Sequence, residues 1–186
     1  MSARAGETFD VARAVADIEA LLAAPLPAAG PTVAEGEPGT GEWTVTAGEG
    51  FRIAPLWEGY APDEVDGTEW DDAEEAAEAQ LASLVEELEG RWGAHQQVAV
   101  HVLLLRQEDG GDAKSLPRQE GEPVPPLFAA LLDEDCYGDL AVWGPASARG
   151  RWVGVSVGRS DGDAPWVMAA VVSDRPIVTP APLSWM

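Results

Sequence analysis

The chain has 186 residues, of which 46% are apolar, and its 33 acidic and 11 basic side chains give a formal net charge of −22. This length and composition predict a soluble globular chain of one domain with a buried core. The charge argues against nonspecific binding to nucleic acid or to an anionic membrane, because both present phosphates that this chain repels. A basic protein partner, a cation or solubility alone can account for it.

The ends and the cysteine content predict a cytoplasmic protein. Cys136 is the only cysteine, so no disulfide can form within the chain and a reducing compartment is expected. The first seven residues lack the apolar core of a signal peptide, and no apolar run is long enough to span a bilayer. We therefore expect no membrane association.

The first expected element is a helix from Thr8 to Ala24, capped by Thr8 and stopped by Pro25. Residues 25–41 are mostly Pro, Gly, Ala and Glu without periodicity, which predicts a linker or mobile loop. The expected core domain is 42–175, and the sequence leaves open whether residues 1–24 form an appendage or pack on it.

A hairpin is expected to open the core domain. Glu42 to Thr46 and Phe51 to Trp57 have strand composition, and the four residues between them include two glycines suited to a turn. An acidic loop over residues 60–67 then leads to the next element.

A long helix is expected from Thr68 to Trp92, with a capping box at its start. Gly90 and Gly93 stand where a left-handed cap can end such a helix. Apolar residues spaced by three or four form a single stripe: Trp70, Ala73, Ala77, Leu81, Leu84, Leu88 and Trp92.

The side of this helix opposite the stripe is acidic and is the candidate partner-binding surface. Its residues are Asp71, Asp72, Glu75, Glu78, Glu86 and Glu89, with Glu74 on the flank. No Lys or Arg occurs between Glu58 and Gly90, although an ordinary surface helix mixes both signs. Like-charged pairs one turn apart each cost about 0.2–0.5 kcal/mol. A plain solvated face is the alternative interpretation.

Val98 to Leu105 is apolar on both faces, which predicts a central strand that buries His101 as a core residue. A polar loop follows over residues 107–123. A short helix is then expected from Pro125 to Leu132, followed by three acids, Asp133 to Asp135, at its negative end.

The last third is expected to be a meander of three strands, Asp139 to Trp143, Arg151 to Gly158 and Trp166 to Ser173. The Pro-rich tail, 176–186, is expected to run along the surface. Six strands and two or three helices joined mainly by hairpins predict an α+β fold with a mainly antiparallel sheet.

Motifs for catalysis or cofactor binding are weak. Residues 154–158 match Gly-x-Ser-x-Gly, but Ser156 lies within a Val-alternating strand instead of the strand-to-helix turn that the chemistry needs. Zinc needs more Cys and His than the chain has, and phosphate-binding glycine motifs are missing. We expect no metal and no cofactor.

The preferred interpretation is a non-enzymatic module that presents the acidic helix face to a basic protein, with Trp57 or Tyr60 as aromatic anchors at its rim. Immunity proteins and antitoxins of basic nucleases use this physical strategy. An adaptor role is equally compatible with such a surface. The alternative is a small enzyme or ligand-binding protein in which Asp133 or Asp135 meets His101 or Cys136, with or without a divalent cation. A third interpretation is an assembly component whose acidity only maintains solubility.

Overall fold

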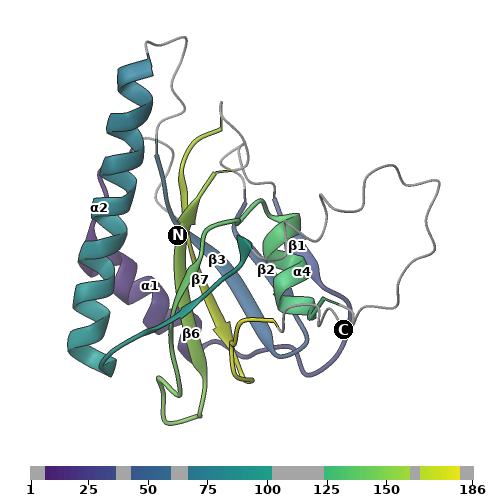
Figure 1. Ribbon diagram of the computed structural model, residues 1–186. Coiled ribbons are helices and arrows are strands. Elements are labelled where there is room, and N and C mark those ends of the chain that lie inside the picture. Colours follow the sequence, from purple (N-terminus) through teal and green to yellow (C-terminus); the bar gives the residue numbers. More distant parts are fainter. Residues whose placement is uncertain (1–6, 37–42, 60–66, 102–123, 160–163, 181–186) are drawn as a thin grey trace, which may run out of the picture.

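The computed structural model in Figure 1 describes residues 7–36, 43–59, 67–101, 124–159 and 164–180. Three helices lie in these ranges: α1 (Val11–Ala23), α2 (Gly67–Trp92) and α4 (Pro126–Asp133). The strands are β1 (Val33–Glu35), β2 (Val45–Gly48), β3 (Phe51–Glu58), β4 (Gln96–Val98), β5 (Leu140–Trp143), β6 (Trp152–Gly158) and β7 (Val167–Ser173). The expected α+β fold is confirmed.

The strands form one seven-stranded sheet in the order β1-β2-β3-β7-β6-β5-β4, with every neighbouring pair antiparallel. The predicted hairpin is β2 and β3, and the predicted meander is β5, β6 and β7. The two groups join where β3 pairs with β7, with Ile53 opposite Val171. These central strands are rich in Val, Ile and Ala and are buried on both faces.

β1 is the strand that was not among the six expected. It lies in the stretch expected to be a linker or mobile loop, so that expectation is wrong for Val33–Glu35. Val33 pairs with Ala47 and Glu35 with Val45 at the outer side of β2. All three β1 residues are exposed. Because this edge strand buries no side chain, it has no hydrophobic alternation that a sequence could reveal.

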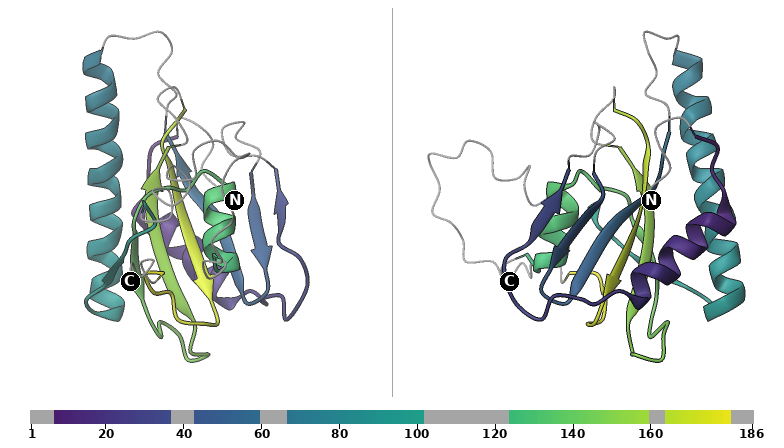
Figure 2. Two further views of the ribbon diagram at one scale, coloured as in Figure 1. Left: turned by 45° about the vertical axis from the view of Figure 1, so that its right-hand side comes forward. Right: turned by 180° about the vertical axis from the view of Figure 1, so that it is seen from behind.

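Helices cover both faces of the sheet (Figure 2). α1 and α2 lie on one face, over a core that includes Ile18, Leu84 and Val155. The shorter α4 lies on the other face, over a core that includes Leu131, Ile53 and Val171. None of the described helices combines the length and the apolarity that crossing a membrane requires.

α1 belongs to the core, which the sequence left open. It buries Ala14, Val15, Ile18, Leu21 and Leu22 against α2, β3 and β7. Its N-cap is Asp10 instead of the expected Thr8: the Asp10 carboxylate accepts a hydrogen bond from the backbone N–H of Arg13 at 3.1 Å. A carboxylate at this position also suits the positive end of the helix dipole.

The prediction of a central strand over Val98 to Leu105 is wrong for its described part, Val98 to His101. β4 starts at Gln96, ends at Val98 and pairs only with β5, at the sheet edge. Val98 and Val100 are buried beside α4, but His101 is exposed. Residues 102–105 lie outside the described ranges. The apolar residues Val98 and Val100 pack in the core under α4, which is also compatible with an edge strand.

The start of the C-terminal tail is partly buried, so the expected surface course does not hold there. The Ile177 side chain is fully buried in the core beneath α4. The Thr179 hydroxyl accepts a hydrogen bond from the backbone N–H of Ala99 at 3.3 Å, beside β4. Residues 181–186 are not among those described.

Candidate functional site

α2 carries the candidate surface and is held by the expected apolar stripe. Ala77, Leu84 and Leu88 are fully buried against α1 and the sheet, while the other described members of the stripe are partly buried. The helix ends at Gly93, which has φ of 84° and donates its N–H to the carbonyl of Glu89 at 2.9 Å. Of the two glycines expected to cap the helix, Gly93 forms the left-handed cap, whereas Gly90 lies within α2. The Thr68 side chain lies outside the described residues.

The face of α2 opposite this stripe presents the predicted carboxylates to solvent. Six of them are exposed: Asp71, Asp72, Glu74, Glu75, Glu78 and Glu86. None of these six forms an ion pair with any residue of the described ranges. From Asp71 to Glu89 the helix advances about 27 Å, at 1.5 Å per residue. The result is a long acidic surface, hereafter the acidic face (these six residues and Glu89).

Arg91 and His95 lie at the C-terminal end of the acidic face and are engaged within the fold. Arg91 contacts Glu19 of α1 at 2.7 Å and Glu87 at 3.3 Å. His95 Nδ1 lies 2.8 Å from Glu89 Oε1, and its ring packs on Trp143 at a centroid distance of 5.6 Å. These contacts tie α2 to α1 and to the sheet. They leave the carboxylates from Asp71 to Glu86 uncompensated.

The sequence interpretation required Trp57 to be an exposed anchor at the rim of the acidic face. Trp57 is buried instead. Its Nε1 donates to the carbonyl of Glu7 at 2.8 Å, and its ring meets Phe9 edge-on at 6.1 Å. A register shift between Pro55 and Trp57 turns the indole to the same side as Leu56. Such a bulge breaks the strand alternation and has no sequence signal here. Tyr60, the second proposed anchor, lies outside the described residues.

The acids after α4 build the fold instead of an open carboxylate site. Glu134 is buried, and its Oε1 accepts a hydrogen bond from the Thr46 hydroxyl of β2 at 2.6 Å. That hydroxyl in turn accepts from the Trp43 indole N–H at 3.0 Å. Burial is the main cause that raises the pKa of Glu134, and the neighbouring charges of Asp133 and Asp135 raise it further, against the Thr46 hydrogen bond. The carboxyl therefore links α4 to β2.

Asp135 and Cys136 end α4 in a Schellman motif. The N–H of Cys136 donates to the carbonyl of Leu131 at 2.8 Å, and that of Asp135 to Leu132 at 3.1 Å. Asp135 takes the left-handed conformation with φ of 56°. Its carboxylate accepts from the Tyr137 hydroxyl at 2.6 Å. These residues are placed by helix termination.

Cys136 does not form a thiol–imidazole pair with His101. Its thiol is buried and donates to the carbonyl of Glu134 at 3.5 Å. Burial, followed by the charges of Glu134 and Asp135, raises its pKa to about 12. A thiol in this setting stays protonated and is a poor nucleophile.

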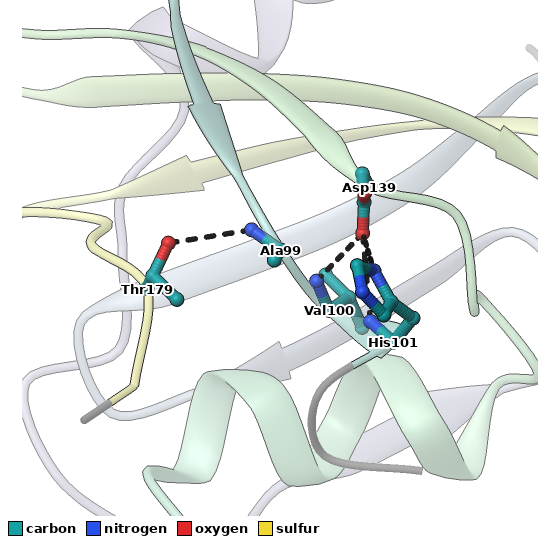
Figure 3. A network of polar contacts seen from close by, with 5 residues as sticks. All are labelled: Ala99, Val100, His101, Asp139 and Thr179. Atoms are coloured by element: carbon teal, nitrogen blue, oxygen red, sulfur yellow. Dashed lines mark hydrogen bonds and ion pairs between the residues drawn. The ribbon is translucent and has the colours of Figure 1, made fainter. Parts of the chain in front are cut away.

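His101 lies at the surface in a polar network with Asp139, shown in Figure 3. One oxygen, Asp139 Oδ1, lies 2.8 Å from His101 Nδ1 and accepts the backbone N–H groups of Val100 at 2.9 Å and His101 at 3.5 Å. The carboxylate thus takes the place of a neighbouring strand just beyond β4. Ser156 is buried in β6, whereas the His101 side chain is 57% exposed, so this arrangement does not resemble a serine triad.

Sequence reasoning missed a cluster at the end of the sheet near the start of α2, which we call the Trp–Arg–Trp cluster: Trp70, Arg159 and Trp166. The guanidinium carbon of Arg159 lies 5.4 Å from the ring centroid of Trp70 and 4.9 Å from that of Trp166. Arg159 directly follows β6 and Trp166 directly precedes β7. The sequence showed these residues only as a stripe member and two loop ends, so no local signal could have joined them.

Neither metal-ligand groups in the described part of the chain nor similarity to known proteins adds a further site. Among the residues described, no three His, Cys, Asp or Glu side chains are grouped to hold a metal ion. No protein-family model, curated protein or solved structure matches the chain.

Proposed function

We propose that the chain is a protein-binding module whose acidic face receives a basic protein partner. The observation that carries the proposal is the row of six exposed carboxylates along the outer side of α2, which form no ion pairs with other described residues. Adjacent acids one helical turn apart repel, so this arrangement is kept at a cost to helix stability. A complementary basic surface would remove that repulsion and gain from the field.

The physical mechanism is electrostatic steering. An acidic surface of this length attracts a basic partner before contact, which raises the association rate at low ionic strength. The Debye length falls to about 8 Å at physiological salt and about 3 Å at 1 M, so association through this face weakens as salt rises. The rigid helix fixes the spacing of the carboxylates and gives the surface a direction.

The test is a pull-down from native lysate at low and at high salt, followed by binding measurements with each basic protein captured. One variant replaces Asp71, Glu75, Glu78, Glu86 and Glu89 by Asn or Gln. A matched control replaces five exposed acids elsewhere, Glu7, Glu35, Glu49, Asp133 and Asp174, so that both variants lose the same net charge.

The proposal expects a basic protein that binds the wild type and the matched control, and that is lost with the α2 variant and at high salt. Equal capture by all three proteins at any salt would show that the acidic face does not bind. Equal weakening of both variants would assign the effect to net charge alone, as in the solubility interpretation. Capture of no basic protein would also count against the proposal.

A further inference from the structure

We infer that the Trp–Arg–Trp cluster is a binding site for a carboxylate group, separate from the acidic face and independent of its proposed partner. Arg159 Nη1 and Trp166 Nε1 are both buried, and neither has a hydrogen-bond partner among the described residues. Because the guanidinium lies over the Trp166 ring, these two unpartnered donors belong to groups in direct contact.

Other arginines of the described chain show what Arg159 lacks. Arg91 and Arg175 contact carboxylates, and Arg151 donates to backbone carbonyls. Arg159 instead has aromatic partners on two rings and forms no ion pair within the described ranges. Contact with indole rings orients a guanidinium group and leaves its N–H groups free to bind an acceptor. Buried donors are normally paired, and an unpaired one is costly.

The donors define the ligand chemistry. A planar guanidinium edge matches the two oxygens of a carboxylate, and an indole N–H beside it adds a third donor. A carboxylate carries a single negative charge. A chain of net charge −22 therefore repels it less strongly than it repels a phosphate dianion. Asp71 and Asp72 follow Trp70 in sequence but are exposed to solvent, so their carboxylates are well hydrated.

The site is within reach of solvent. Trp70, Arg159 and Trp166 are each only partly buried, and they lie at the end of the sheet where β6 finishes and β7 begins. The two donor atoms are themselves buried, so a ligand reaches them after a small side-chain adjustment. Such adjustments are common on binding. The carboxylate could come from a small organic acid or from the C-terminus of a peptide, and the experiment separates these sources.

The experiment follows the Trp166 indole N–H by ¹H–¹⁵N NMR while sodium acetate is added to the full chain. The Trp166→Phe variant assigns the signal, and sodium chloride at equal ionic strength is the reference. The indoles of Trp43, Trp57 and Trp143 already donate hydrogen bonds and serve as internal controls. A second arm compares triglycine, which has a free carboxylate, with triglycine amide.

A saturable shift of the Trp166 signal with acetate or triglycine, without a shift from chloride or the amide, supports the site. A response to acetate shows that the site accepts small organic acids. A response to triglycine but not to acetate shows that the site is selective for peptide C-termini. Arg159→Lys keeps the charge but loses the planar edge, so we expect affinity to fall about tenfold, while Arg149→Lys binds as wild type.

No movement in either carboxylate arm would overturn the inference, as would equal movement with chloride. Equal affinity of Arg159→Lys and wild type would show that the guanidinium edge is not the ligand-binding group. If Arg159→Lys does not fold, the wild-type titrations decide the question alone. The binding of a basic partner to α2 is not needed for any of these results.

Discussion

Arg151 donates a hydrogen bond from Nη1 to the carbonyl oxygen of Ala24 at 2.6 Å, across 127 residues of sequence. The same nitrogen donates to the carbonyl of Leu22. α1 has no basic residue in its last turn, so this buried guanidinium supplies the positive charge and the donors that its C-terminus needs. A residue directly before β6 therefore holds the first helix on the core.

Replacing Arg151 by Ala should lower the free energy of unfolding by about 2–4 kcal/mol, because hydrogen bonds to a charged group are lost and carbonyls stay buried. Urea unfolding followed by tryptophan fluorescence measures the change. Arg149→Ala is the matched control, since Arg149 is exposed, and its effect should stay within about 0.5 kcal/mol. Similar values for both variants would contradict the capping role of Arg151.

Replacing Asp139 by Ala should cost about 1–3 kcal/mol, because the buried Val100 loses the acceptor of its backbone N–H. Asp139→Asn keeps an acceptor oxygen and should cost less. His101→Ala removes only an exposed partner and should cost less than about 1 kcal/mol. If His101→Ala proves as costly as Asp139→Ala, the backbone contacts are not what makes Asp139 important.

Glu134→Gln should raise the free energy of unfolding at pH 7 and keep the Thr46 hydrogen bond. Burial raises the pKa of Glu134 in the folded state, so the fold favours its protonated form. The stability due to this carboxyl is full below its ordinary pKa of about 4.3 and is lost as the pH rises through its folded pKa. The advantage of the variant should therefore shrink toward pH 4.

The measurement is urea unfolding of wild type and Glu134→Gln across this pH range. Part of the pH dependence should persist in the variant, because burial also raises the pKa of Glu58. A variant less stable than wild type at pH 7 would show that the ionised carboxylate is favoured in the fold.

Native Cys136 should react with a thiol reagent such as DTNB roughly a thousandfold more slowly at pH 8 than in concentrated urea, because its pKa of about 12 leaves little thiolate. The absorbance of the released thiolate gives both rates. Labelling at comparable rates in the native and unfolded protein would contradict the burial of this thiol.

Glu78→Lys should raise the free energy of unfolding by about 0.5 kcal/mol, because repulsion from Glu74 one turn earlier becomes attraction. Glu78→Gln, which only removes the repulsion, should give a smaller gain. Thermal unfolding by circular dichroism compares the three proteins. A stabilised lysine variant that binds a basic partner less well would show the trade-off expected of a functional surface, whereas a destabilised one would contradict the repulsion.

Local regularities were enough to predict much of this fold. The three- and four-residue spacing of Leu81, Leu84 and Leu88 defined α2 and also which of its sides faces solvent, because both follow from helix geometry alone. Alternation along β6 and the glycines between β2 and β3 likewise predicted strands and a turn. The exposure of the acidic face was therefore predictable from sequence.

Tertiary structure alone decided the contacts between distant residues. Thr46 and Glu134 lie 88 residues apart, and only the packing of α4 over β2 brings them together. The β3–β7 pairing, the bulge that buries Trp57 and the stacking of Arg159 between Trp70 and Trp166 are of the same kind. Such contacts depend on how whole elements pack, and periodicity within one element carries no information about which element it meets.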